Sequence, residues 1–460
     1  MARSYRSTGP RHAWIAGGLC FLVSANSLQA QTDPPPTPPP LSGQQANDGP
    51  VSDGSEGVPE SFTRAAAIDW ALRNNPDLAA FRQQHGIAMA AVIIAKTYPF
   101  NPVWTNKLFA VNGPESAGIT NRLAMEQRIS IDVEVRHQRR YRRQAACAAL
   151  SRTDWEILNQ ELLLAMRVIR AFDNALYQRD KLQLAEESLR LQQSAAEQVD
   201  KLVKGGILRG PDNAILARSE VDTFSIAVNT ARSVQARAES DLRAALGLRN
   251  EAIHVAGALS PTPTVDDAQN LVQEALDRRP DLQARQAALH EAEGRLRLAI
   301  ADRFGNPNIG PDYEYNETRA NFLGMQMTVP LPVFNKHRGE ILQREAERNR
   351  AALDLRSTET LIQQQVYAAL SRLNTARATV EMYQTRVLPH LEESVKDMER
   401  LFLEGGGDLL RVINLRAKLL QARGGQLDAL YELRQGYNDL AAAVADPTLT
   451  LDAAAGGPAP

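Results

Sequence analysis

Hydrophobic residues follow two different periods along this chain, and the two periods predict two kinds of secondary structure. From about 102 to 131 and from about 308 to 333, apolar residues tend to occupy every second position, which is typical of strands with one apolar face. From 136 to 204 the chain contains neither Gly nor Pro, and apolar residues recur at seven-residue spacing, which predicts a helix of about 100 Å. A second helix of similar length is predicted from 338 to 403. The fold class is therefore mainly α, with added strand pairs.

Each strand pair is predicted to have one apolar and one polar face. The first apolar face holds Ile119, Leu123, Met125, Ile129 and Ile131, opposite Thr120, Arg122, Glu126, Arg128 and Ser130. In the second pair Leu323, Met325, Met327, Val329 and Leu331 alternate with Gly324, Gln326 and Thr328. A soluble half-buried hairpin and a membrane barrel with a polar interior both explain this pattern. Four strands cannot close a barrel alone, so the membrane interpretation requires several copies of the chain.

The long helices carry coiled-coil seams. In the second helix, positions spaced alternately by four and three are Leu355, Glu359, Ile362, Val366, Ala369, Leu373, Ala376, Val380, Tyr383 and Val387. In the first helix the seam is Leu162, Ile169 and Leu176, followed one residue out of register by Leu182, Leu189, Ala196 and Val203. These seams predict neighbouring helices packed closely along their length. A soluble antiparallel coiled coil without a channel remains an alternative.

The chain repeats itself with an offset of about 200 residues. Residues 71–78 (ALRNNPDL) are matched by residues 275–282 (ALDRRPDL). We therefore predict a first unit over 61–250 and a second over 266–446. Each unit has short helices, a strand pair, a long helix, a Gly-containing turn and a returning helix, which indicates a duplicated domain-sized unit.

The first 60 residues are predicted to lie outside the folded part. Residues 1–30 resemble a secretory signal peptide, because arginines precede the short apolar run Ala13–Val23. Residues 31–60 are a Pro-rich linker, and residues 447–460 a flexible tail. Simple cleavage is favoured over lipidation of Cys20, because Leu19 is larger than the small residue that a lipoprotein signal needs before its cysteine.

Cleavage leaves Cys147 as the only cysteine, and we expect it to be a buried small apolar residue. No stretch after the signal peptide is predicted to reach the ~18–20 apolar residues of a transmembrane helix.

Composition excludes several function classes. The 52 Lys and Arg residues nearly balance the 54 Asp and Glu residues, so the net charge of −2 does not favour bulk nucleic-acid binding. We find no Gly-rich phosphate loop or nucleophile motif, and no Cys, His or Met cluster with metal-ligand spacing. The sequence predicts no catalytic residue, cofactor or metal site, and hence no enzyme.

The order of these elements resembles the TolC family of outer-membrane efflux channels, from about Phe62 to Ala445. The motifs that carry the resemblance are residues 75–78 (NPDL), residues 329–335 (VPLPVFN), Val387-Leu388-Pro389 and the two Gly-containing turns. The resemblance implies a homotrimer in the outer membrane whose twelve-stranded barrel continues as a helical coiled-coil tunnel into the periplasm. It implies a passive duct, without cofactors, that docks onto a periplasmic membrane-fusion adaptor and an inner-membrane pump of the RND or ABC type.

Residues 330–335 are similar to the heavy-metal branch of that family, which handles cobalt, zinc, cadmium, copper or silver. A type I secretion exit channel is the alternative, and a periplasmic coiled-coil adaptor protein is another. The sequence does not identify the transported substrate.

The two Gly-containing turns are the candidate periplasmic tips, where the resemblance implies the gate and the adaptor contact. The residues concerned are Gly206, Gly210, Asp212 and Arg218 in the first, and Glu404, Gly405, Asp408, Arg411 and Asn414 in the second. Asp212 is placed to cap the returning helix. Arg411 and Asn414 occupy positions where the family has an acidic ring, so that ring is not preserved. We hypothesise that Asp212 and Arg411 of neighbouring tips pair and hold the entrance closed.

A basic cluster follows the first strand pair, where relatives have a Gly-Lys-Arg step. It comprises Arg136, Arg139, Arg140, Arg142 and Arg143. The cluster is expected at the periplasmic end of the barrel. A solvated helix start, contact with lipid headgroups and a lining of the tunnel all explain it.

Overall fold

This computed structural model describes residues 58–59, 61–113, 116, 122–205, 212–259, 268–404 and 409–446, all within one compact unit. The helices are α1 Arg64–Asn74, α2 Pro76–Arg82, α3 Gln84–Lys96, α4 Gln138–Lys204, α5 Asp212–Leu246, α6 Ala268–Arg278, α7 Pro280–Asp302, α8 Arg338–Met382, α9 Leu388–Leu403 and α10 Leu409–Val444. The strands are β1 Ser61–Phe62, β2 Val103–Val111, β3 Arg122–Asp132, β4 His254–Val255, β5 Asn308–Tyr315 and β6 Asn321–Thr328. The predicted signal peptide, most of the linker, the C-terminal tail and Ile119 lie outside the described residues.

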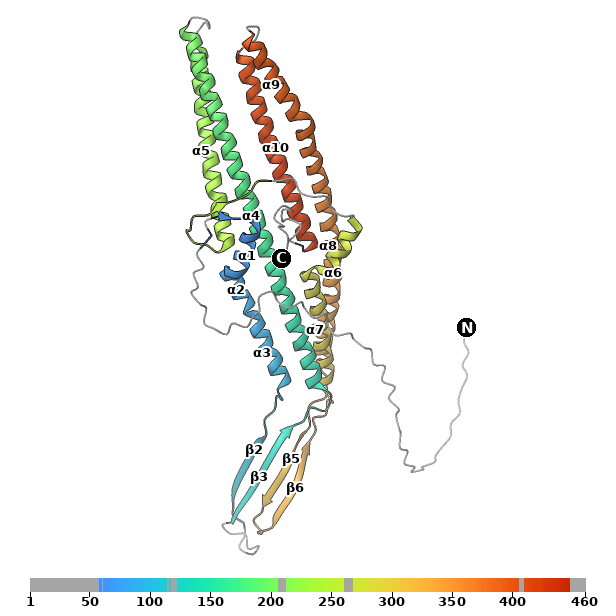
Figure 1. Cartoon of the computed structure of the whole chain (residues 1–460). Coiled ribbons are helices and arrows are strands. Elements are labelled where there is room, and N and C mark those ends of the chain that lie inside the picture. The colour runs from blue at the N-terminus through green and yellow to red at the C-terminus, as the bar shows by residue number, and fades with distance from the viewer. Residues whose placement is uncertain are drawn as a thin grey trace, which may run out of the picture. The chain divides into compact units, whose positions relative to one another are not determined.

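The larger sheet joins the two halves of the chain. Its strand order is β2-β3-β5-β6, and every neighbouring pair is antiparallel, so each half contributes one hairpin. Figure 1 shows these strands together beyond the ends of α3, α4, α7 and α8. The second strand pair was predicted to reach residue 333, but β6 ends at Thr328. Pro330 and Pro332 follow directly, and proline has no N–H to donate to a strand ladder.

Helix α4 begins at Gln138, a short connection after the end of β3 at Asp132, and continues without interruption for 67 residues to Lys204. It contacts α5 along the first hairpin, and α7, α3 and α10 along its flanks. Its seam residues Ile169 and Leu176 are buried, together with Phe172. Leu176 and Phe172 belong to a hydrophobic core shared with α1 and α5, which also contains Phe62 and Leu242, whereas Ile169 packs with Met166 and with Ala441 of α10.

The second long helix is not continuous, contrary to the prediction of one helix over 338–403. Helix α8 buries the predicted seam from Ile362 to Val380 and then passes through the π-helical turn η2 Tyr383–Val387 into α9. Pro389, in the first turn of α9, lacks an N–H and crowds the preceding turn, which accounts for the wider hydrogen-bonding. On the facing helix, Gly425 leaves room for the Tyr383 ring, where a Cβ would collide with it.

Short helices before each strand pair pack against the long ones. In the first half, the helical stretch after Asn75 is divided at Gln83 into α2 and α3. Asn75 caps α2, because its side chain accepts hydrogen bonds from the backbone of Asp77 and Leu78. Helix α7 crosses α4 closely, since a Cβ on Gly294 would lie 2.9 Å from the backbone of Ala145.

Two expectations about single features were wrong. Cys147 is exposed, because it lies on the face of α4 that neither α3 nor α7 covers, whereas its neighbours Ala145 and Ala148 are buried. The stretch Pro76–Lys96 is long and apolar enough to cross a membrane by length and composition, although we expected no such stretch. Only 17% of it is buried, and it is divided between α2 and α3.

Candidate functional site

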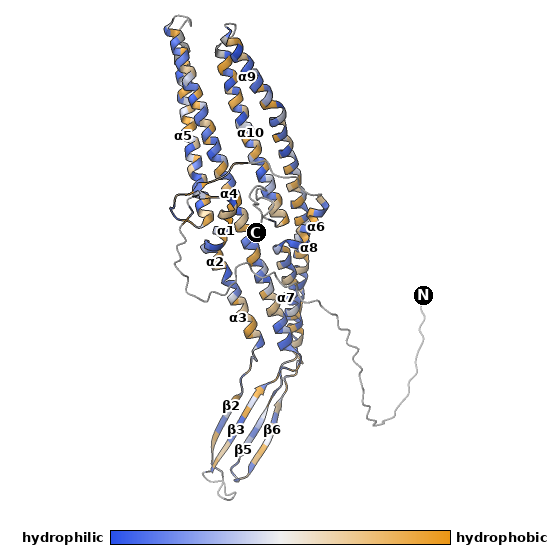
Figure 2. Ribbon diagram, in the orientation of Figure 1, coloured by the Kyte–Doolittle hydropathy of each residue, from blue (hydrophilic) through white to orange (hydrophobic). Residues whose placement is uncertain are grey.

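One face of the four-stranded sheet is apolar and exposed. The register places Trp104 opposite Ile129, Leu108 opposite Met125, Tyr313 opposite Leu323 and Ile309 opposite Met327, so these side chains share one face. The most exposed members of the face are Trp104, Leu108, Leu123, Ile129, Leu323, Met325 and Met327. Figure 2 shows the alternation of hydrophobic and hydrophilic residues along the strands. A contiguous apolar face of this kind indicates a non-aqueous contact.

The opposite face of the same sheet carries a network of charged side chains. Lys107 Nζ lies 3.0 Å from Glu126 Oε2, and Arg128 contacts Glu126 at 2.9 Å and Asp312 at 3.6 Å. The network crosses β2, β3 and β5, and it places Glu126 directly opposite Glu314. One face of the sheet is therefore apolar, as the alternation in the sequence predicted, whereas the other combines this charged network with the exposed side chains of Val103, Phe109 and Phe322.

The hairpin of α4 and α5 is closed near its tip by one ion pair between the helices, beside a second pair within α4. Arg218 on α5 reaches Asp200 on α4 at 3.1 Å, and Lys204 contacts the same carboxylate at 2.7 Å. The hydrogen bond from Lys204 comes first among the causes that lower the pKa of Asp200, ahead of a smaller contribution from Arg218. Arg218, predicted as a gate residue, is thus engaged within its own hairpin.

An equivalent pair closes the second hairpin, where Arg416 on α10 contacts Glu399 on α9 at 2.6 Å. The acidic partners Asp200 and Glu399 were not predicted. They lie 18 and 17 residues before their arginines, one on each side of a Gly-containing turn, and this shared spacing is the signal that could have found them.

Four of the nine predicted tip residues are not placed by the structure. Gly206, Gly210, Gly405 and Asp408 lie outside the described residues. Asp212 begins α5, but its side chain is not among those described. Glu404, Arg411 and Asn414 are exposed. The hypothesised pair between Asp212 and Arg411 stays a prediction.

A buried polar cluster ties α1, α4 and α10 together in the middle of the bundle. Arg64 donates to Asp173 Oδ1 from Nε at 3.1 Å and from a terminal nitrogen at 2.6 Å, and Asn438 donates to Asp173 Oδ2 at 2.8 Å. All three side chains are buried. Sequence analysis missed this cluster, although a signal exists: Asp173 stands between Ile169 and Leu176, where the seam of α4 should be apolar.

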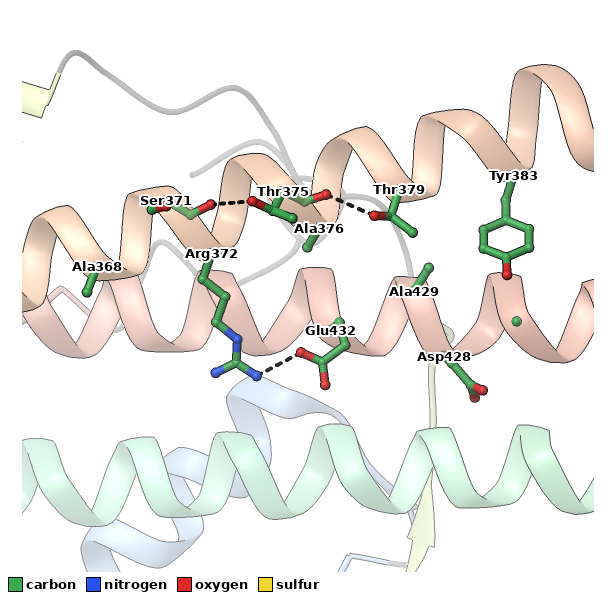
Figure 3. Close-up of a pocket in the computed structure, with 11 residues that line it drawn as sticks. Ala368, Ser371, Arg372, Thr375, Ala376, Thr379, Tyr383, Asp428, Ala429 and Glu432 are labelled. Atoms are coloured by element: carbon green, nitrogen blue, oxygen red, sulfur yellow. Dashed lines mark hydrogen bonds and ion pairs between the residues drawn. The ribbon is translucent and has the colours of Figure 1, made fainter.

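A pocket of about 770 Å³ lies between α8 and α10 (Figure 3). In it Arg372 reaches from α8 to Glu432 on α10 at 2.8 Å and also contacts Asp439. The hydrogen bond that Arg372 donates to Glu432 is the main cause that raises the pKa of Arg372. The charged side chains of this pocket hold α8 and α10 together, so its geometry indicates helix pairing.

Beside this pocket, α4 contacts α10 through stacked tyrosines. The rings of Tyr177 and Tyr431 are 4.3 Å apart, and the Tyr177 hydroxyl donates to Asp428 at 2.7 Å. Burial first, and then this hydrogen bond, raise the pKa of Tyr177. Among the described residues, no group of three or more His, Cys, Asp or Glu side chains could hold a metal ion.

Comparisons with known proteins agree with this architecture. Residues 271–446 match the outer membrane efflux protein family. The solved structure of CusC, at 18% sequence identity and a TM-score of 0.67, covers 83% of this chain and 91% of that one. The match to VceC of Vibrio cholerae (14% identity, TM-score 0.66) covers 83% of this chain and 96% of VceC. The match to the open state of the MtrE channel of Neisseria gonorrhoeae (15% identity, TM-score 0.66) covers 85% of this chain and 90% of MtrE. No curated protein matches the sequence. The likenesses establish that this chain has the TolC-like fold of outer-membrane efflux channels.

Proposed function

We propose that this chain, whose residues 271–446 match the outer membrane efflux protein family, is the outer-membrane channel of a tripartite efflux system. The observation that carries the proposal is a sheet with one apolar and one charged face, continuous with two long helical hairpins. Strands of 8–11 residues have about the length that crosses a bilayer when tilted. In this role the apolar face contacts lipid, and the charged face lines a water-filled passage.

The channel is proposed to be a homotrimer with a shared twelve-stranded barrel. Within the described sheet, β2 and β6 each have one neighbour and leave one edge unpaired. Open strand edges are not tolerated in hydrocarbon, so the edges must pair with those of other copies. In such a trimer a helix of a neighbouring copy also covers the exposed apolar side chains of α3, which are Ile87, Ile93 and Ile94.

A pair of adjacent substitutions in β6 tests the membrane assignment. Met325→Arg places a charge on the apolar face and costs roughly 2–4 kcal/mol at the bilayer midplane, whereas Gln326→Arg places it on the polar face. We expect Met325→Arg to reduce the heat-sensitive trimer found in outer membranes, and Gln326→Arg to assemble and change conductance in planar bilayers. Equal tolerance of both substitutions, or a soluble periplasmic monomer, would contradict the proposal.

A periplasmic adaptor and an inner-membrane pump are proposed to deliver the cargo. Heavy-metal cations are the favoured cargo, because residues 330–335 are similar to the heavy-metal branch of the family. A strain that lacks its own channel, supplied with this gene and its neighbouring pump, distinguishes the candidates. Restored growth in cobalt, zinc, cadmium, copper or silver supports metal export. Restored secretion of a protein supports the alternative of a type I exit channel.

Arg411 is exposed near the second tip, so the hypothesised pair with Asp212 can be tested by substitution. Reversing its charge with Arg411→Glu removes any pairing with Asp212 of a neighbouring tip. An exposed ion pair contributes only about 0–1 kcal/mol, but a trimer repeats it three times around the entrance. We expect a higher single-channel conductance, and an unchanged conductance would exclude the pair.

A further inference from the structure

A pocket of about 640 Å³ at the start of α4 collects positive charge. Lys96 from α3 and Arg139, Arg140 and Arg143 from α4 line it. Glu134 also lines the pocket, but its carboxylate contacts Arg142 at 2.7 Å. No ion pair within the described part of the chain engages any of the four cations that line the pocket. Their charges are therefore available to an external anion.

The fold does not require these charges. Helix α8 starts with the same local geometry as α4: His137 and His337 both precede their helix with a left-handed backbone, at φ of 60° and 51°. Two hundred residues after Arg139, Arg140 and Arg143, the second half has Gly339, Glu340 and Gln343.

Positive charge in the first turn of a helix is also unfavourable, because it opposes the helix dipole. The first turn of α8 contains the acidic residue Glu340, whereas that of α4 contains no acidic residue. Arg139 and Arg140 thus cost stability in the first turn of α4, whereas the first turn of α8 balances Arg338 with Glu340, which indicates that the basic pocket has a ligand.

The surroundings of the pocket indicate which anion it meets. The β3–β5 ladder continues past the strands, since Val133 donates to Pro307 at 2.8 Å, so Val135 follows on the side of the apolar face and is exposed. Tyr98 also lines the pocket and donates to the backbone of Asp132 at 2.6 Å. Exposed Tyr and Trp side chains mark the level where hydrocarbon meets headgroups, and Trp104 lies at the start of β2.

The distances agree with the headgroup layer. Arg143 is five residues beyond the first residue of α4, or roughly 8 Å along the helix. The headgroup layer on each side of a bilayer is about 5–7 Å thick. The guanidinium groups therefore extend from the end of the membrane sheet through the depth that lipid phosphates occupy.

We propose that Lys96, Arg139, Arg140 and Arg143 bind the phosphate group of an anionic phospholipid in the periplasmic leaflet. Arginine forks match phosphate oxygens with paired hydrogen bonds, and Tyr98 and Val135 contact the adjoining apolar part of the lipid. The inference rests on the proposed function, because it needs the sheet to lie in a membrane. It assigns the first half of the chain a lipid contact that the second half lacks.

Brominated lipids provide the test, because they quench the fluorescence of nearby tryptophan. The protein with Trp14, Trp70 and Trp155 replaced by Phe, so that Trp104 is its one tryptophan, is reconstituted into phosphatidylcholine vesicles with increasing fractions of brominated phosphatidylglycerol or brominated phosphatidylcholine, and the quenching of Trp104 is followed. The variant is Arg140→Gln with Arg143→Gln. The matched control removes the same charge from the second half, as Lys336→Gln with Arg338→Gln.

We expect brominated phosphatidylglycerol to quench at a lower fraction than brominated phosphatidylcholine. A basic residue near an anionic surface is worth about fivefold in affinity, so the double variant should weaken the preference roughly 25-fold, while the control keeps it. Equal quenching by both lipids, or equal loss in variant and control, overturns the site. Loss of the preference in millimolar inorganic phosphate assigns the pocket to free phosphate and overturns the lipid proposal. If neither lipid quenches Trp104, the membrane assignment itself fails.

Discussion

Removing the carboxylate of Asp173 should be among the most damaging single changes in this chain. Asp173 on α4 is completely buried and accepts hydrogen bonds from Arg64 on α1 and Asn438 on α10. Asp173→Ala leaves the guanidinium of Arg64, whose side chain is 5% exposed, without this carboxylate. The substitution therefore removes a carboxylate from beside a buried guanidinium in the centre of the bundle.

The size of the effect follows from burial. Breaking a buried ion pair by removing one partner costs about 3–5 kcal/mol, because the remaining charge is desolvated and uncompensated. The exposed pair of Arg232 and Glu186, with a similar separation of 2.9 Å, is a matched control. Its loss through Arg232→Ala should cost less than about 1 kcal/mol. The cost at Asp173 should therefore be at least threefold larger.

The assay is urea unfolding of the purified protein in detergent, followed by far-ultraviolet circular dichroism. A second variant, Asp173→Leu combined with Arg64→Met, removes both charges and should recover most of the stability lost in Asp173→Ala, since a buried pair replaced by apolar residues is often neutral. If Asp173→Ala costs no more than Arg232→Ala, the cluster does not stabilise the bundle. If the double variant is less stable than the single one, desolvation is not the cause.

Two further predictions concern the contacts of α4. Gly294→Ala forces a Cβ to 2.9 Å from the backbone of Ala145 and should lower the melting temperature despite a gain in helix propensity. Gly339→Ala has open space around its Cβ and should leave the free energy of unfolding unchanged or raise it by up to about 1 kcal/mol. Tyr177 has a raised pKa, so the stability of its neutral contact with Asp428 is complete below the ordinary tyrosine pKa of about 10 and is lost as pH rises above it. Thermal unfolding at pH 8 and 11 should therefore show a steeper loss in the wild type than in Tyr177→Phe, and equal losses would contradict this cause.

Patterns that extend over many residues could be predicted from the sequence. Alternation predicted both faces of the sheet, because one misplaced residue would move every side chain of a strand to the other face. The seam from Ile362 to Val380 is buried as predicted, because its four-and-three spacing admits one helix face only. Such signals are redundant, and single exceptions do not change them.

Features that depend on one residue meeting another could not be predicted in the same way. Asp173 looks like a defect in an apolar seam until Arg64, more than a hundred residues earlier, is placed beside it. Cys147 was expected to be buried because free cysteines usually are, but exposure depends on which faces of α4 its neighbours cover. At the tips, the sequence indicated Arg218 but not the carboxylate of Asp200 that holds it.

The two halves of the chain differ in the continuity of their long helices. Helix α4 is continuous, whereas the matching helix is interrupted by a π-helical turn whose Tyr383 fits against Gly425. A π-turn is poorer in hydrogen-bond geometry than the helix around it, and it is retained where a local change of direction is needed. The second hairpin can therefore bend at a defined point where the first has none. If the passage widens at its periplasmic end, the second hairpin should move and the first should act as its support.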